Sequence, residues 1–109
     1  MNIKHIPFDT TDWASVKSER HPGASGYADW KVRQCGDIRV RVVEYSPGYR
    51  ADHWCAKGHI LYCLEGALTT ELKDGRVVEL RKGMSYQVED DNVPHSSHTT
   101  NGALLFIVD

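Results

Sequence analysis

Apolar and polar residues alternate with a period of two over much of the chain from Asp37 onward. The segment 38–42 reads Ile-Arg-Val-Arg-Val, and successive side chains of a strand point to opposite sides of a sheet. The segment therefore predicts a β-strand with one buried face, on which Ile38, Val40 and Val42 lie. A helix would need a period near 3.6 residues instead, so this pattern restricts the fold strongly.

The same alternation recurs in short segments that are separated by turn residues. The strand predicted after the Lys57-Gly58 turn has two faces, His59, Leu61 and Cys63 on one and Ile60, Tyr62 and Leu64 on the other. Asp74-Gly75 predicts a two-residue type I′ hairpin, because both central positions of that turn need positive φ. Residues 104–108 form the last predicted strand. Short strands at this spacing predict an all-β fold, either an antiparallel sandwich or a closed barrel.

The length and composition predict a single globular domain. The chain has 109 residues, of which 40% are hydrophobic, and this suffices for one modest core. Residues 1–28 differ from the rest, because they contain one potential helical turn around Trp13 and a loop-like segment over 21–26. We expect 1–28 to form an N-terminal arm laid against a barrel domain that spans 29–109.

Charge and cysteine content narrow the range of partners. Thirteen basic and 15 acidic residues give a formal net charge of -2 with no basic run, so we expect no nucleic-acid partner. No apolar run is long enough for a secretory signal or a membrane span, so we expect no membrane association. Three cysteines are an odd number for a disulfide framework, which favours a reducing compartment, and we place the protein in the cytoplasm.

Residues 52–66, DHWCAKGHILYCLEG, concentrate potential metal ligands. His53 and Cys55 project from one face of an extended segment, about 6.6 to 7 Å apart along the strand. A tight turn at Lys57-Gly58 would fold His59 back beside them. Such donors suit zinc, iron, nickel or copper far better than magnesium or calcium.

The spacing of these residues resembles the first motif of the cupins. Gly48 comes first, one residue closer than usual, and His53, Cys55, His59 and Gly66 stand at the motif's spaced positions. Cys55 stands in place of a histidine and His59 in place of a glutamate. Both replacements can still bind a metal. The resemblance therefore implies an antiparallel cupin barrel of the jelly-roll type with a soft metal site.

A second cupin motif is similar to the later part of the chain. Lys82-Gly83, Val88 and Pro94-His95 match its start, its apolar position and its closing histidine, with a loop one residue longer than usual. The DHWC tetrapeptide at 52–55 looks like that of small cupins named for a motif of Asp, His, Cys and Trp. This resemblance implies that His53, Cys55, His59 and His95 hold one divalent metal ion, zinc first and iron, nickel or copper as alternatives.

Other residues are expected around this site rather than in it. Asp52 is interpreted as an acceptor that orients a ligand histidine or as an ordinary turn residue. His98 lies an odd number of residues after His95, which predicts that it faces the other side of its strand. The predicted lining of the pocket is Leu61, Cys63, Tyr86 and Val88.

Three functions remain open at this point. A site with an open coordination position would predict a metal-dependent enzyme acting on a small molecule, of the oxygenase or isomerase type. A closed CysHis3 zinc site would serve stability or small-ligand sensing instead. The third possibility is a metal-free barrel that binds a sugar or another small molecule. In each case we expect a homodimer, because an exposed sheet edge needs covering.

Overall fold

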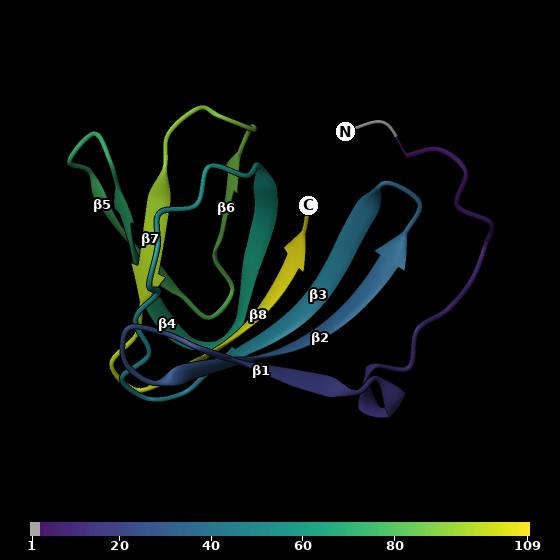
Figure 1. Ribbon diagram of the computed structural model, residues 1–109, viewed down its shortest axis with the longest axis horizontal. Coiled ribbons are helices and arrows are strands. Elements are labelled where there is room, and N and C mark those ends of the chain that lie inside the picture. The colour runs from purple at the N-terminus through teal and green to yellow at the C-terminus, as the bar shows by residue number, and fades with distance from the viewer. Residues whose placement is uncertain (1–2) are drawn as a thin grey trace.

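Eight antiparallel strands and one short 3-10 turn account for the regular structure of residues 3–109, the part of the chain that the computed structural model describes (Figure 1). The predicted all-β barrel is confirmed. The elements in chain order are η1 (Trp13–Ser15), β1 (Ser18–Pro22), β2 (Tyr27–Cys35), β3 (Ile38–Tyr45), β4 (His59–Leu72), β5 (Val77–Arg81), β6 (Ser85–Val88), β7 (His95–His98) and β8 (Ala103–Val108).

Strand β4 connects the two halves of the barrel. Its first half pairs with β8 and β6, and its second half pairs with β5 and β7. The register on β8 shifts between Cys63 and Glu65, and Gly66 follows with a φ of 76°. A bulge of this kind bends a strand and increases its twist, so one strand can belong to both sheets. The remaining strands continue from β8 in the order β3, β2, β1.

The core lies between the inner faces of these strands. His59, Leu61 and Cys63 of β4 point inward as predicted, while Ile60 and Tyr62 are 46% and 42% exposed on the outer face. The same alternation on the other strands fills the interior with small and branched side chains. The buried cluster consists of Ala28, Val43, Leu61, Cys63, Leu68, Leu80, Ala103, Leu105 and Ile107.

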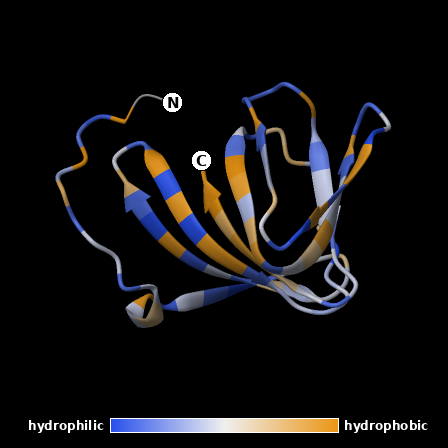
Figure 2. Cartoon of the chain, turned by 180° about the vertical axis from the view of Figure 1, so that it is seen from behind, coloured by the Kyte–Doolittle hydropathy of each residue, from blue (hydrophilic) through white to orange (hydrophobic). Residues whose placement is uncertain are grey.

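The predicted buried face of β3 is wrong for Val40 and Val42, although Ile38 at the start of the strand is buried. Arg41 is only 6% exposed and lies on the inner side of the strand with Val43, whereas Val42 is half-buried on the outer side. The bands along β3 in Figure 2 show this alternation. The outer side also carries apolar residues because Val42 pairs with Phe106, which in turn packs edge-on against Trp13 at 6.3 Å between ring centroids. Both faces of β3 are therefore covered, and apolar alternation alone cannot identify the inner one.

The N-terminal segment begins with the predicted helical turn. Asp12 caps η1, since its carboxylate accepts hydrogen bonds from the Ala14 amide at 3.1 Å and from the Ser15 hydroxyl at 3.0 Å. Strand β1 then pairs antiparallel with β2 and forms one end of the strand order. The division into an arm at 1–28 and a barrel at 29–109 stays a prediction.

None of the helices within residues 3–109 is both long enough and apolar enough to cross a membrane.

The Asp74-Gly75 hairpin exists, but its turn is not of type I′. Gly75 has a φ of 98°, whereas Asp74 keeps a negative φ. The Gly75 amide donates to the Leu72 carbonyl at 2.9 Å, and the Asp74 carboxylate accepts from the Arg76 amide at 3.1 Å. The hydrogen bond from the Arg76 amide to the Asp74 side chain favours a four-residue loop, in which only Gly75 takes the left-handed region.

Gly66 and Gly75 provide a matched test of what the β4 bulge requires. Both have positive φ, but a Cβ on Gly66 would collide with the Gly102 carbonyl, whereas a Cβ on Gly75 would meet open space. We expect Gly66→Ala to lower the free energy of unfolding by about 2–5 kcal/mol and Gly75→Ala by about 1–2 kcal/mol. Urea denaturation measures both. Equal losses would show that the backbone conformation alone matters at Gly66.

Candidate metal centre

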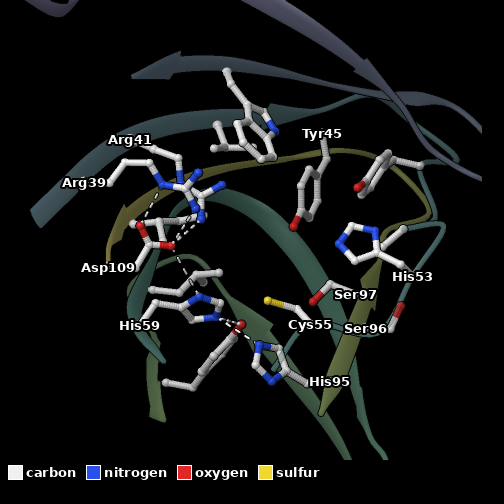
Figure 3. A pocket seen from close by; sticks show the side chains of 17 residues that line it. Arg39, Arg41, Tyr45, His53, Cys55, His59, His95, Ser96, Ser97 and Asp109 are labelled. Atoms are coloured by element: carbon white, nitrogen blue, oxygen red, sulfur yellow. Dashed lines mark hydrogen bonds and ion pairs between the residues drawn. The ribbon is translucent and has the colours of Figure 1, made fainter. Parts of the chain in front are cut away.

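Three metal-binding side chains meet inside the barrel. One donor atom from each of Cys55, His59 and His95 lies within 4.8 Å of the other two (Figure 3). His59 is the first residue of β4 and His95 the first of β7, so two strand ends fix the two rings. Cys55 comes from the loop before β4 and is held opposite His95 by two backbone hydrogen bonds of 2.8 and 2.9 Å. The cluster thus joins segments that are far apart in the sequence.

The hydrogen bonds of the two rings determine which nitrogens face the cluster. Nδ1 of His95 lies 3.0 Å from the Val93 carbonyl oxygen, which can only accept, so this nitrogen carries the proton. The other nitrogen of His95, Nε2, lies 3.1 Å from Nε2 of His59 and offers a lone pair to a metal when the ring is neutral. The Tyr86 hydroxyl is 2.8 Å from the same His59 atom. The Val93 carbonyl thus holds the nitrogen of His95 that does not face the cluster, which is typical of a histidine that binds a metal. The Tyr86 contact is on the His59 nitrogen that faces the cluster.

The electrostatics of the cluster favour a thiolate at Cys55. A hydrogen bond from His95 lowers the pKa of the Cys55 thiol, although partial burial acts in the opposite direction. The same bond raises the pKa of His95. The thiolate is the form of cysteine that binds metals, so the neighbouring ring prepares the sulfur for a cation.

The donor set fits a transition metal. Two nitrogens bound to one tetrahedral zinc lie roughly 3.3 Å apart, given Zn–N bonds of about 2.0–2.1 Å. The measured separation of 3.1 Å between the two Nε2 atoms is close to this value. One sulfur and two imidazole nitrogens suit zinc, iron, nickel or copper.

A buried carboxylate stands behind His59. The Asp109 side chain is fully buried and accepts two hydrogen bonds from Arg39, at 2.9 and 3.0 Å, and one from Arg41 at 2.9 Å. Its Oδ2 atom also lies 3.8 Å from Nδ1 of His59. Burial alone would raise the pKa of Asp109, but His59 and the two guanidiniums hold it well below its usual range.

This carboxylate and both arginines were not predicted as site residues from the sequence. The available signal was the position of Arg39 and Arg41 on alternate residues of a strand that is apolar at every other position. Because both faces of this strand are covered, the face that carries the two arginines is buried together with their charges.

A cavity of about 170 Å³ connects the cluster to the arginines. Its apolar wall includes Trp30, Val43 and Ile107, and Leu61 and Tyr86 line it as predicted. Figure 3 shows the Cys55 sulfur and the ring of His59 directed into this space. A second hollow, a groove of about 730 Å³, lies at the open end of the barrel, and we call it the mouth groove. It shares His59 and Asp109 with the cavity. Its other walls include Gly58, Gln87, Val88, Glu89 and Asp90.

His53 lies outside the cluster. Its ring is 73% exposed at the rim of the cavity, and its Nδ1 atom donates to the Asp52 carboxylate over 2.7 Å. The expected extended strand is replaced by a bend, with bridge pairing only at Cys55. Asp52 contacts a histidine as expected, but this histidine is His53, which does not belong to the cluster of Cys55, His59 and His95. Ligation by His53 stays a prediction.

The other candidate residues have different positions. Cys63 is fully buried in the core, where its thiol donates to the Glu65 carbonyl at 3.4 Å rather than facing the cavity. Val88 of β6 pairs with His59 of β4 and lines the mouth groove. His98 faces the opposite side of β7 from His95, as predicted, and lies 3.9 Å from Glu71.

Many solved structures have a similar fold, although no family model and no curated protein matches the sequence. An RmlC-like cupin from Shewanella frigidimarina is similar with a TM-score of 0.72 and 16% identity, over 94% of this chain and 90% of that chain. The polyketide cyclase RemF from Streptomyces resistomycificus gives a TM-score of 0.74 and 22% identity, over 94% and 78%. Fe(II)-HppE with the alternative substrate (S)-1-HPP gives 0.76 and 16%, over 94% and 60%. This chain therefore has the predicted cupin fold.

Replacement of Asp109 tests the charge network behind His59. Asp109→Asn leaves the buried guanidinium of Arg41 and the partly exposed one of Arg39 without their carboxylate, and we expect a loss of about 3–5 kcal/mol in the free energy of unfolding at pH 7. The folded pKa of Asp109 is depressed, so its contribution is complete above about pH 4 and disappears as the pH falls toward the folded pKa. The difference between wild type and variant should therefore shrink below about pH 4.

Urea denaturation of metal-free protein at pH 7 and at pH 3.5 measures this effect. Asp74→Asn is the matched control, because Asp74 also pairs with an arginine but lies in an exposed turn, and its replacement should change stability little. A difference for Asp109→Asn that stays constant between the two pH values would contradict the assigned charge state.

Proposed function

We propose that this chain is a metal-binding cupin that acts on a small molecule at a centre formed by Cys55, His59 and His95. The observation that carries the proposal is the convergence of three soft donors on the wall of an internal cavity. Three protein ligands leave a coordination position free, which is the arrangement of catalytic zinc sites. The resemblance to the small cupins named for Asp, His, Cys and Trp supports the same assignment.

A metal bound here would polarise an oxygen of the substrate or activate a water molecule. The chain's own residues prepare the site for this. The Val93 carbonyl orients the ring of His95, and Asp109 provides negative charge next to Nδ1 of His59. Trp30 and Leu61 keep the cavity wall apolar, which strengthens polar interactions inside it. Zinc is our first choice of metal, and iron, nickel and copper fit the same donors.

A closed CysHis3 site is the second candidate. It is supported by the position of His53 two residues before Cys55 and at the rim of the same cavity. The ring would have to leave its bond with Asp52 and turn inward. Such a site would exclude water and would serve stability or ligand sensing rather than catalysis.

Metal content separates these candidates. We expect Cys55→Ser, His59→Gln and His95→Gln to lose stoichiometric metal, because each removes one of three donors, while His53→Gln retains it. Elemental analysis after purification without a metal-binding tag gives the stoichiometry, and X-ray absorption spectroscopy gives the ligands. One sulfur, two nitrogens and a water oxygen are expected. Loss of metal in His53→Gln, together with a third nitrogen in the spectrum, would identify the closed site, and no metal at all would contradict both candidates.

We also propose that the protein is a homodimer in the cytoplasm. Ile60 and Tyr62 project from the outer face of β4, and β1 offers a free strand edge, so apolar surface and unpaired backbone groups are available for a second copy. All three cysteines are free thiols, which agrees with a reducing compartment.

Light scattering at micromolar concentration tests the dimer. The expected mass is about twice the 12.3 kDa of one chain. Tyr62→Glu places a charge on the outer face and should shift the protein toward the monomer, whereas Val77→Glu on β5 should not. A monomeric wild type would contradict the proposal.

A further inference from the structure

We propose that Arg39 and Arg41 form a subsite inside the cavity for the carboxylate group of a small organic acid, which is the substrate or ligand of the neighbouring centre. This inference rests on the proposed function and names the chemical class that the same site accepts. It goes beyond the metal ligands, because these two side chains come from β3 and contact none of the three donors directly.

The arginines carry more positive charge than the protein neutralises. Two guanidiniums share one carboxylate, that of Asp109, and all three groups line the cavity. These three groups together therefore leave one positive charge at the cavity, and a bound metal ion would increase it. A buried charge of this kind favours a counterion of opposite sign.

Arg41 also has an unused hydrogen-bond donor. Its side chain is 8% exposed, and its guanidinium donates to Asp109 through Nη2. The Nε atom of the same group is buried and finds no hydrogen-bond partner among residues 3–109. A buried donor without an acceptor costs about 1–3 kcal/mol. An oxygen atom of an entering anion would supply the acceptor that this N–H group lacks.

The surroundings hold the arginines in place for such a ligand. The Trp30 ring centroid lies 4.5 Å from Cζ of Arg41 and 5.5 Å from Cζ of Arg39, within the range of cation–π contacts. Arg39 is further fixed by its two bonds to Asp109. A guanidinium that is already oriented loses less conformational entropy when it binds a planar carboxylate.

The subsite is next to the candidate metal centre. Nη2 of Arg41 and Nδ1 of His59 both approach the same oxygen of Asp109, at 2.9 and 3.8 Å. Figure 3 shows Arg39 and Arg41 on one side of the cavity and the Cys55, His59 and His95 cluster on another. One short molecule can therefore place its carboxylate at the arginines and a second polar group at the centre.

Size and charge select the ligand class. Pockets for drug-sized ligands measure about 300–1,000 Å³, whereas this cavity measures about 170 Å³, so the occupant is small. A monocarboxylate matches the single uncompensated charge and the flat guanidinium geometry. A phosphate dianion would exceed that charge. The apolar wall of Trp30, Val43 and Tyr45 suits a short hydrocarbon body.

Titration with butanoate, its uncharged isostere butanamide and inorganic phosphate tests the subsite. We expect butanoate to raise the melting temperature and to shift the NMR resonance of the Arg41 Nε–H, while butanamide at equal concentration does neither and phosphate binds more weakly. Arg41→Gln should weaken butanoate binding at least tenfold. Arg20→Gln is the matched control, because Arg20 also pairs with an aspartate but is exposed on β1, and it should change the affinity less than twofold.

Each measurement is made on the protein as purified and again after treatment with a chelator. Butanoate binding that persists without metal supports the arginine subsite even where the metal analysis overturns the proposed function. Binding that requires metal and leaves the Arg41 resonance unchanged would assign the carboxylate to the metal instead and overturn the inference. Equal binding of butanoate and butanamide, or tighter binding of phosphate, would overturn it as well. If Arg41→Gln fails to fold, the wild-type Arg41 resonance decides.

Discussion

The structure depends on one long strand that belongs to two sheets. Strand β4 can do so because its register shifts after Cys63 and because Gly66 occupies a conformation and a space that no other residue fits well. Without that bend, the β5 and β7 strands would not close over the inner face of the barrel. The candidate centre follows from this closure, since His59 begins β4 and His95 begins a strand that pairs with its far half.

The interior of this barrel is divided by polarity rather than uniformly apolar. Leu68, Leu80 and Leu105 pack in the buried apolar cluster, whereas the charged network and the ligand cluster surround the cavity. The two polar groups meet at His59, whose ring contacts Tyr86 and His95 through one nitrogen and approaches Asp109 with the other. Changes in the charge of Asp109 and changes at the metal donors are therefore coupled through a single ring.

The fold and part of the site could be predicted from the sequence because strand periodicity and motif spacing are local properties. His59 and Cys63 faced inward as expected, since a period of two fixes relative orientation within one strand. The inner face of β3 could not be predicted, because Trp13 and Phe106 cover its outer side and make both faces partly apolar. The sequence predicted an extended strand at His53, but the chain does not form one there. Residues 51–54 bend before the single bridge at Cys55.

The interior cavity and the mouth groove lie on two sides of the same side chains. The interior cavity and the mouth groove share His59 and Asp109, so these side chains separate an inner chamber from an outer vestibule. A molecule can approach the chamber along the rim beside His53 or from the vestibule. The residues that define the chemistry of the chamber are thus also the residues that separate its two approaches.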